Sequence, residues 1–358
     1  MSRFFSSKYK ELVPYTPGEQ PTGTEYIKLN TNELPYPPSQ KSIKAAAEAA
    51  KRLNLYPDPE CYELTSLLAN KLGVDREEVL LTNGSDEILN FAFMAFCDEE
   101  HPAAFADITY GFYSVFAQIN RVPYEIIPLN KDFTIDINLY KGINKTIFIA
   151  NPNAPTGIVL STAEIEEILQ ANPNNVVVID EAYVDFGNES CVPLIHKYDN
   201  LLVTRTFSKS RAMAGARLGF GVGSKELIRD LNTIKYSPNP YNIKRMTMAA
   251  GIGMLEDEEY TINNCKEIIK NREYTKRALK ALGFEQTPSA TNFVFAKHKD
   301  ISGEKLYLEL KNRGILVRHF ASDKICEYNR ITIGTREQME ALISAIEEIL
   351  KENKYEEQ

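Results

Sequence analysis

Short apolar runs alternate with amphipathic stretches through the middle of the chain. The runs predict buried strands at 79–82, 103–108, 145–150, 175–180 and 201–206. Helical patterns separate several of them, as in STAEIEEILQAN, where Ser161 and Glu164 have the spacing of a capping box. Parallel strands need such crossovers, so the pattern predicts an α/β fold with a mostly parallel sheet covered by helices on both faces.

The two ends of the chain have different patterns. Residues 1–29 show little periodicity, which predicts an extended arm. Beyond a long helix at 257–282, the pattern predicts strands at 293–297, 314–320 and 329–334 and helices at 302–313 and 336–352. We therefore expect an N-terminal arm (1–29), a large domain (30–256) and a smaller α+β C-terminal domain (257–358) that the arm completes.

Composition and charge narrow the class of protein. The 358 residues are 43% hydrophobic and 25% charged, as in ordinary globular proteins. A net charge of −8 argues against nucleic acid as a partner, since phosphate backbones attract basic surfaces. The sequence contains no apolar run long enough to span a membrane, and MSRFFSSKYKELVPY lacks the apolar core of a secretory signal. These features predict a cytoplasmic protein.

The cysteines and histidines offer no metal site. Five widely spaced cysteines form no CxxC pair and no ligand spacing with the four histidines, so we interpret them as reduced structural thiols. His196 and His319 stand alone in the sequence, and a lone histidine is more often structural than catalytic.

The clearest chemical signal is Thr206-Phe207-Ser208-Lys209, which directly follows a predicted strand. Arg217 comes eight residues later, within the small-residue stretch AMAGARLGFG. The hydroxyls of Thr206 and Ser208 and the guanidinium of Arg217 are suitable phosphate ligands. By itself a lysine after a strand is usually a surface charge, so its interpretation depends on the neighbouring strand ends.

The preceding strand, NVVVID, ends in Asp180, with Tyr183 three residues later. Ligands of open α/β sheets bind at this edge, and a carboxylate there suits the protonated ring nitrogen of pyridoxal 5′-phosphate (PLP). Tyr183 is placed to donate to the phenolic oxygen of the same cofactor. Taken alone, Asp180 would be interpreted as a helix N-cap.

Other strand ends supply further cofactor candidates. Gly84, Ser85 and Asp86 precede a helix whose free N–H groups suit a phosphate. Tyr110 is a candidate to stack on an aromatic ring, although a core tyrosine is the commoner case. The rigid turn Asn151-Pro152-Asn153-Ala154-Pro155-Thr156-Gly157 can aim an asparagine.

Along the chain, these elements occur in the order phosphate turn, aromatic residue, asparagine turn, aspartate and lysine. In that order they resemble the class I/II aminotransferases of fold-type I, which are PLP enzymes, and the resemblance extends over essentially the whole chain. The resemblance implies a Schiff base between Lys209 and PLP, with Asp180 on the ring nitrogen. It also implies that Tyr183 and the 151–157 turn bind the phenolic oxygen. The family usually has asparagine immediately before Pro-Thr-Gly, where this chain has Ala154. We therefore assign that role to Asn153.

The N-terminal segments LVPYTPG, LNTNELPYPP and LNLYPDPECYELTSLLA resemble the histidinol-phosphate aminotransferase subgroup. The resemblance implies that Tyr15 lies over the site and that Tyr56 reaches the cofactor phosphate of the other subunit of a homodimer. Asn32 is grouped with the substrate-binding residues. Arg318 and Arg330 are expected to bind the substrate anion, since arginines facing one cleft favour an anion between them. We set Arg336 aside because it opens the last helix.

The implied reaction is amino transfer from L-histidinol phosphate to 2-oxoglutarate, giving imidazole acetol phosphate and glutamate, with Lys209 as the proton shuttle. Two enzymes of the same fold remain alternatives: a threonine-phosphate decarboxylase and an aromatic aminotransferase. A non-catalytic PLP-binding sensor is a third alternative. Intact Lys209 and Asp180, and no basic helix-turn-helix before residue 30, argue against the sensor.

Overall fold

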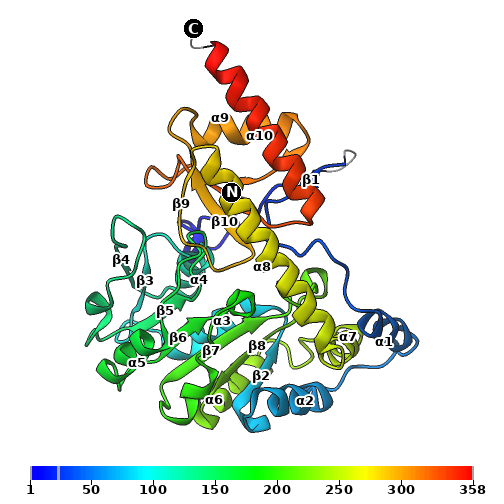
Figure 1. The fold of residues 1–358 in the computed structure, drawn as a ribbon. Coiled ribbons are helices and arrows are strands. Elements are labelled where there is room, and N and C mark those ends of the chain that lie inside the picture. Colours follow the sequence, from blue (N-terminus) through cyan, green and yellow to red (C-terminus); the bar gives the residue numbers. More distant parts are fainter. Residues whose placement is uncertain (1, 22–24, 357–358) are drawn as a thin grey trace.

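The structure is a computed structural model that describes residues 2–21 and 25–356, with side chains through residue 353. A large sheet with its helices forms one part, a smaller sheet with two helices forms the other, and the long helix α8 (Glu258–Ala281) runs along both (Figure 1). Among the described residues, no helix is long and apolar enough to cross a membrane.

The large sheet has seven strands, and most of its pairings are parallel. In spatial order they are β2 (Val79–Thr82), β8 (Gly219–Gly223), β7 (Leu201–Thr206), β6 (Val177–Asp180), β5 (Thr146–Ala150), β3 (Ala103–Ala106) and β4 (Tyr124–Ile127). β8 runs antiparallel to both of its neighbours, β2 and β7. The predicted fold class is confirmed.

Helices cover both faces of this sheet, because alternate strand residues point to opposite sides. Ile147, Ile179 and Val203 pack in one cluster with α2 (Tyr62–Leu72), α5 (Thr162–Ala171) and α7 (Arg245–Leu255). Phe148, Val178 and Leu202 pack in another with α3 (Ser85–Phe96), α4 (Phe112–Asn120) and α6 (Lys225–Tyr236). The first helix, α1 (Gln40–Ala50), packs against α7.

The five predicted strands all form, and the capping box of Ser161 and Glu164 is present at α5. The sequence pattern missed β4, whose first three residues are exposed at the sheet edge, and β8. The sequence pattern did not predict β8 because glycine is uncommon in strands. The packing of the fold nevertheless requires glycine there. A Cβ on Gly219 would lie 2.4 Å from the backbone of Gly84 and Ser85, so glycine lets the start of α3 approach the sheet.

The smaller part contains a four-stranded antiparallel sheet. Its strands in order are β12 (Arg318–His319), β13 (Asn329–Thr332), β10 (Phe293–Lys297) and β9 (Glu285–Gln286), and its helices are α9 (Gly303–Asn312) and α10 (Arg336–Glu356). The single strand predicted at 314–320 is wrong. It is divided into β11 (Ile315–Leu316) and β12, because the two halves pair with different strands.

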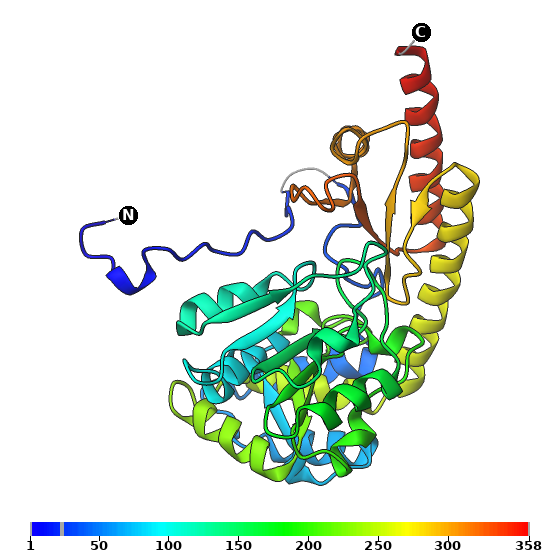
Figure 2. The same ribbon diagram turned by 90° about the vertical axis from the view of Figure 1, so that its left-hand side faces the viewer.

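The N-terminal segment ends as part of the smaller unit. Strand β1 (Ile27–Lys28) pairs in parallel with β11, and Leu29 is fully buried in the core of that unit. Residues 13–19 contact α4 and the smaller unit, and the residues before them extend away from the body, as the blue segment of Figure 2 shows. The chain therefore passes through the smaller unit before it enters the large sheet.

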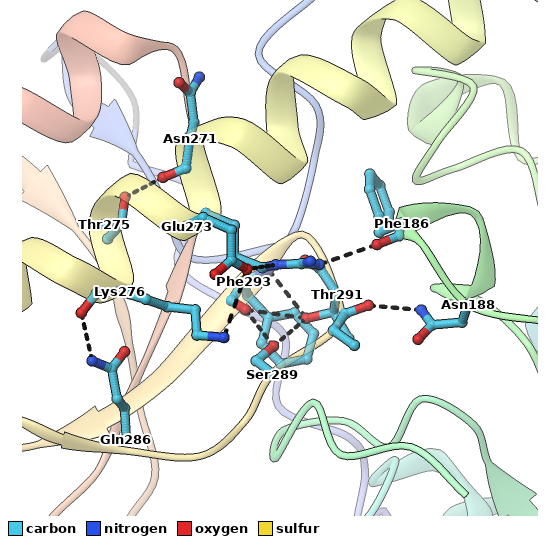
Figure 3. Close-up of polar contacts among 12 residues, drawn as sticks. Phe186, Asn188, Asn271, Glu273, Thr275, Lys276, Gln286, Ser289, Thr291 and Phe293 are labelled. Atoms are coloured by element: carbon cyan, nitrogen blue, oxygen red, sulfur yellow. Dashed lines mark hydrogen bonds and ion pairs between the residues drawn. The ribbon is translucent and has the colours of Figure 1, made fainter. Parts of the chain in front are cut away.

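Buried polar contacts join the two parts. Arg272 on α8 donates through Nη1 to the carbonyls of Phe186 (3.1 Å) and Thr291 (2.9 Å). Asn188 donates from Nδ2 to the carbonyl of Ala290 at 2.8 Å. Figure 3 shows Phe186 and Asn188, which follow β6, facing Thr291 before β10. The loop that leaves Asp180 is thus fixed to the smaller sheet.

Candidate active site

The carboxyl ends of the parallel strands surround a cavity of about 90 Å³. Most of the residues proposed for cofactor binding line it, namely Ser85, Asp86, Tyr110, Asp180, Tyr183, Thr206, Ser208, Lys209 and Arg217. They meet because the ends of neighbouring parallel strands lie at one edge of the sheet, where ligands of open α/β folds bind.

Lys209 lies between this cavity and a larger adjoining cleft of about 380 Å³, and it lines both. Its Nζ donates to the carbonyl of Thr31 at 3.2 Å and lies 5.7 Å from the ring centre of Tyr183. This hydrogen bond holds the amine in place without an ion pair. A carbonyl is a weaker partner than a carboxylate. The amine is therefore available to a ligand in either space.

Asp180 is buried at the end of β6. Its Oδ2 accepts from the Tyr113 hydroxyl at 3.2 Å, and its Oδ1 accepts from the Ala182 N–H at 3.2 Å. Burial raises the pKa of Asp180 to about 6. No lysine or arginine within the described part of the chain forms an ion pair with it. A cationic ring nitrogen in the cavity would supply the missing charge.

The phosphate candidates meet where α3 begins. Gly84 precedes the helix with φ +81°, and a Cβ there would lie 2.6 Å from Nη2 of Arg217. Arg217 donates to Asp86 at 2.8 Å, and Ser208 Oγ is buried without a hydrogen-bond partner. The positive end of the helix, the guanidinium and an unsatisfied hydroxyl form a site suited to a phosphate.

Tyr110 is tied to this phosphate site. Its hydroxyl donates to Asp86 at 2.6 Å, and burial, followed by the Asp86 charge, raises the pKa of Tyr110. Its ring meets that of Tyr113 edge to face, with centroids 5.7 Å apart. The sequence analysis missed Tyr113, although it stands three residues after Tyr110 in the same aromatic run. Two aromatic residues one helical turn apart were the available signal.

The structure does not bring Asn153 into the cavity. Its Nδ2 donates to the carbonyl of Ile108 (2.9 Å) and to Thr156 Oγ1 (3.0 Å), and its Oδ1 accepts from Thr109 Oγ1 at 2.8 Å. It lines a separate cavity, whereas Ala154 lines the one beside Lys209. The amide of Asn153 is occupied by this turn, which corrects its assignment to the role left vacant by Ala154.

The larger cleft contains the expected substrate residues Tyr15, Asn32, Arg318 and Arg330. Arg318 donates to the carbonyls of Thr16 (3.0 Å) and Pro17 (3.2 Å), which holds the arm at the cleft. Arg330 donates to the carbonyl of Asn30 at 3.0 Å, while its Nε is buried without a partner. Burial lowers the pKa of Arg330. An anion bound in the cleft would give the Nε of Arg330 a hydrogen-bond partner and would favour the charged form of its guanidinium group.

Two other candidates lie outside the cavity and the cleft. Tyr56 is 78% exposed and stacks on Tyr241 with centroids 4.7 Å apart. Arg336 forms an exposed ion pair with Glu340 at 2.7 Å and lies over the ring of Tyr274. Arg336 therefore lies apart from the cavity and the cleft, and the structure of one chain does not bring Tyr56 to its own cavity.

Residues 24–346 match the family model for aminotransferases of class I and II. The chain belongs to this family. Histidinol-phosphate aminotransferase from Brachyspira hyodysenteriae is 50% identical over 98% of this chain and 100% of the relative. The enzyme of the same name from Marinomonas sp. is 51% identical over 97% of this chain and 99% of its own length.

A solved structure of a related protein supports the same architecture. The histidinol-phosphate aminotransferase from Sinorhizobium meliloti, solved in complex with pyridoxal-5′-phosphate, superposes with a TM-score of 0.89. It is 22% identical and covers 98% of this chain and 99% of its own, so it speaks for the fold alone. The predicted resemblance to class I/II aminotransferases is confirmed, and this aminotransferase acts on small amino and keto substrates.

Proposed function

We propose that this aminotransferase transfers the amino group of L-histidinol phosphate to 2-oxoglutarate with PLP as cofactor, a step of histidine biosynthesis. The products are imidazole acetol phosphate and glutamate. The observation that carries the proposal is the pair Arg318 and Arg330, which lines the same cleft as Lys209. Relatives that are about 50% identical over the full chain bear the name of this activity.

The cavity residues suit the parts of PLP one by one. Asp180 would hold the proton of the ring nitrogen, and Tyr183 would donate to the phenolic oxygen. Arg217, Ser208 and the N–H groups at the start of α3 would hold the phosphate. When bound, PLP supplies the electron sink for charge that develops on the substrate α-carbon.

Lys209 provides the proton chemistry. Its Nζ lies where the cavity meets the cleft, so it reaches both the cofactor site and a substrate held by the arginines. As a neutral amine it takes the proton from the substrate α-carbon and returns it on the cofactor side. Tyr15, whose ring stacks on Phe112 with centroids 4.2 Å apart, also lines the cleft and would limit water around a bound substrate.

The proposal includes a cytoplasmic homodimer with shared sites. Tyr56 and Tyr241 form an exposed aromatic pair. Leu53 and Leu55, which precede Tyr56 in the sequence, are exposed as well. Exposed apolar groups of this kind are typical of interfaces. Tyr56 is thus available to a second subunit. A cytoplasmic location suits an enzyme whose substrates are intermediates of amino-acid metabolism.

The test is a panel of amino donors assayed with 2-oxoglutarate after loading with PLP. We expect histidinol phosphate to have the highest kcat/KM, above phenylalanine and tyrosine. Preference for an aromatic donor would favour the aromatic aminotransferase. Carbon dioxide release from O-phosphothreonine without a keto acid would favour the decarboxylase. Absence of a visible cofactor band after loading would contradict every PLP-dependent function.

A further inference from the structure

Asn32, which the sequence groups with the substrate-binding residues, forms its side-chain hydrogen bonds with Tyr183 and Thr332. We propose that Asn32 is a positioning residue that directs the hydroxyl hydrogen of Tyr183 toward the phenolic oxygen of the cofactor. The inference rests on the proposed PLP function. It gives Asn32 a role in setting the protonation of the Lys209–cofactor linkage, independent of substrate.

The direction of donation follows from the hydrogen-bond partners. Nδ2 of Asn32 donates to Tyr183 Oη at 2.8 Å, with both residues buried. An amide NH₂ group only donates, so Oη is the acceptor in this bond and its own hydrogen points elsewhere. Among the described residues none accepts a hydrogen bond from that hydroxyl, and Tyr183 lines the cavity. The hydrogen is therefore available to a ligand there.

The amide of Asn32 is held in one orientation. Thr332 on β13 accepts from the Asn32 backbone N–H at 3.0 Å and donates through Oγ1 to Asn32 Oδ1 at 3.0 Å. If the amide were reversed, the buried Thr332 hydroxyl would lose its acceptor, which is unfavourable in a site closed to water. Asn292 donates instead to the backbone carbonyl of Asn32 at 2.9 Å, so it holds the backbone and not the amide. The smaller sheet thus fixes which end of the amide meets Tyr183.

The Tyr183 ring is fixed as well. It meets Phe293 on β10 edge to face, with centroids 5.2 Å apart. Thr332, Asn32 and Tyr183 then form a chain of donors that ends in the cavity, and each bond in such a chain strengthens the next. Removing Asn32 would weaken the last donor and free its hydroxyl to rotate.

The hydrogen-bond chain of Thr332, Asn32 and Tyr183 matters more in this protein because position 154 is an alanine. The position lines the cavity but has no amide, and Asn153 is occupied within its turn. Of the two groups that the family resemblance assigns to the phenolic oxygen, Tyr183 is the one that this structure retains. Its donation stabilises the negative charge on that oxygen, which disfavours the protonated form of the nearby Lys209–cofactor linkage.

The test measures the pH midpoint of the visible absorption band of PLP-loaded protein without substrate. Asn32→Ala should raise the midpoint by about one unit, the scale of one strong hydrogen bond. Asn32→Asp should raise it further, since a carboxylate only accepts and would take the Tyr183 hydrogen. Asn292→Ala is the matched control, because it removes the anchor on the Asn32 backbone and leaves the Tyr183 bond. Its midpoint should stay unchanged.

A double-mutant cycle with Tyr183→Phe separates positioning from a merely structural role. We expect Asn32→Ala to add no shift in the Tyr183→Phe background. An unmoved midpoint in Asn32→Ala, or an equal shift without the hydroxyl, would overturn the inference. If Asn32→Ala fails to fold, the nearly isosteric Asn32→Asp carries the test alone. Failure of the wild type to form any visible band would instead reject the proposed function.

Discussion

Arg318 and Arg330 lie directly opposite each other on the antiparallel strands β12 and β13. Like charges in this position repel, at a cost of up to about 1 kcal/mol. Both side chains line the cleft beside Lys209, and the Nε of Arg330 is buried without a partner. An anion between the guanidinium groups would relieve this repulsion, which supports our proposal that the pair binds a phosphate or a carboxylate of the substrate.

Replacing Arg330 with glutamine should therefore weaken the binding of both substrates. We expect kcat/KM to fall about 10- to 100-fold for histidinol phosphate and for 2-oxoglutarate, since a hydrogen bond to a charged group contributes about 1.5–3 kcal/mol. Steady-state kinetics with each substrate varied measures this. Arg336→Gln is the control and should leave both values unchanged. Equal kinetics for the two variants would move the anion site elsewhere.

Lys209→Ala should remove the proton shuttle. Turnover should fall by about 10²- to 10⁴-fold from lost acid–base catalysis alone. Single-turnover reaction of PLP-loaded protein with the amino donor measures the effect. Borohydride should fix the cofactor to the peptide that contains residue 209 in the wild type and in Lys225→Ala, a surface control paired with Asp75. Cofactor fixed to another lysine would contradict the assignment.

Asp180 should make the stability of the cofactor-free protein fall as pH rises. Burial raises its pKa to about 6 from an ordinary value near 3.8, so between these values the folded state keeps a proton that the unfolded state has lost. The difference corresponds to about 3 kcal/mol, all of it lost above pH 6. Urea unfolding should find cofactor-free Asp180→Asn more stable than the wild type at pH 8.

The advantage of Asp180→Asn should vanish near pH 4, where both side chains are neutral. It should also reverse once PLP is bound, because a neutral amide cannot pair with a protonated ring nitrogen. A wild type that keeps constant stability relative to the variant from pH 4 to pH 8 would mean that Asp180 is not strained in the empty cavity.

Arg272→Met should destabilise the junction between the two parts. The carbonyls of Phe186 and Thr291 would lose their donor in a buried site, at a cost of about 2–4 kcal/mol. Chemical denaturation measures the loss. Lys276→Met on the same helix is the control, since its ion pair with Glu273 is partly exposed and should contribute less than about 1 kcal/mol. Equal stabilities would exclude Arg272 as a structural anchor.

Shared sites predict complementation between inactive subunits. Tyr56→Ala and Lys209→Ala homodimers should both have low activity. Refolding them together should form heterodimers in which one site has both Lys209 and a neighbour's Tyr56. We expect activity to recover toward one quarter of the wild type, because half of randomly mixed dimers would each hold one intact site. If the subunits are shown to exchange but activity does not recover, the site is not shared between subunits.

Much of the cavity could be predicted from sequence. Asp180 and Thr206 follow apolar runs, and the geometry of parallel strands brings such positions to one edge. The glycines of β8 hid a strand, because their requirement comes from the approach of α3 and not from strand preference. Asn153 was misassigned because neighbouring positions in a tight turn point in different directions, and only the contacts with Ile108 and Thr109 reveal which.

By itself, the sequence determined most of the elements, their order and the residue types at the strand ends, because periodicity and covalent order are local properties. Only the tertiary structure decided which distant groups meet. Thr31 contacts Lys209 across 178 residues, and Asn32 contacts Tyr183 across 151. The opposition of Arg318 and Arg330 depends on strand register. The contacts of Thr31 and Asn32 arise when the smaller unit docks on the large sheet, and no local pattern encodes either that docking or the strand register.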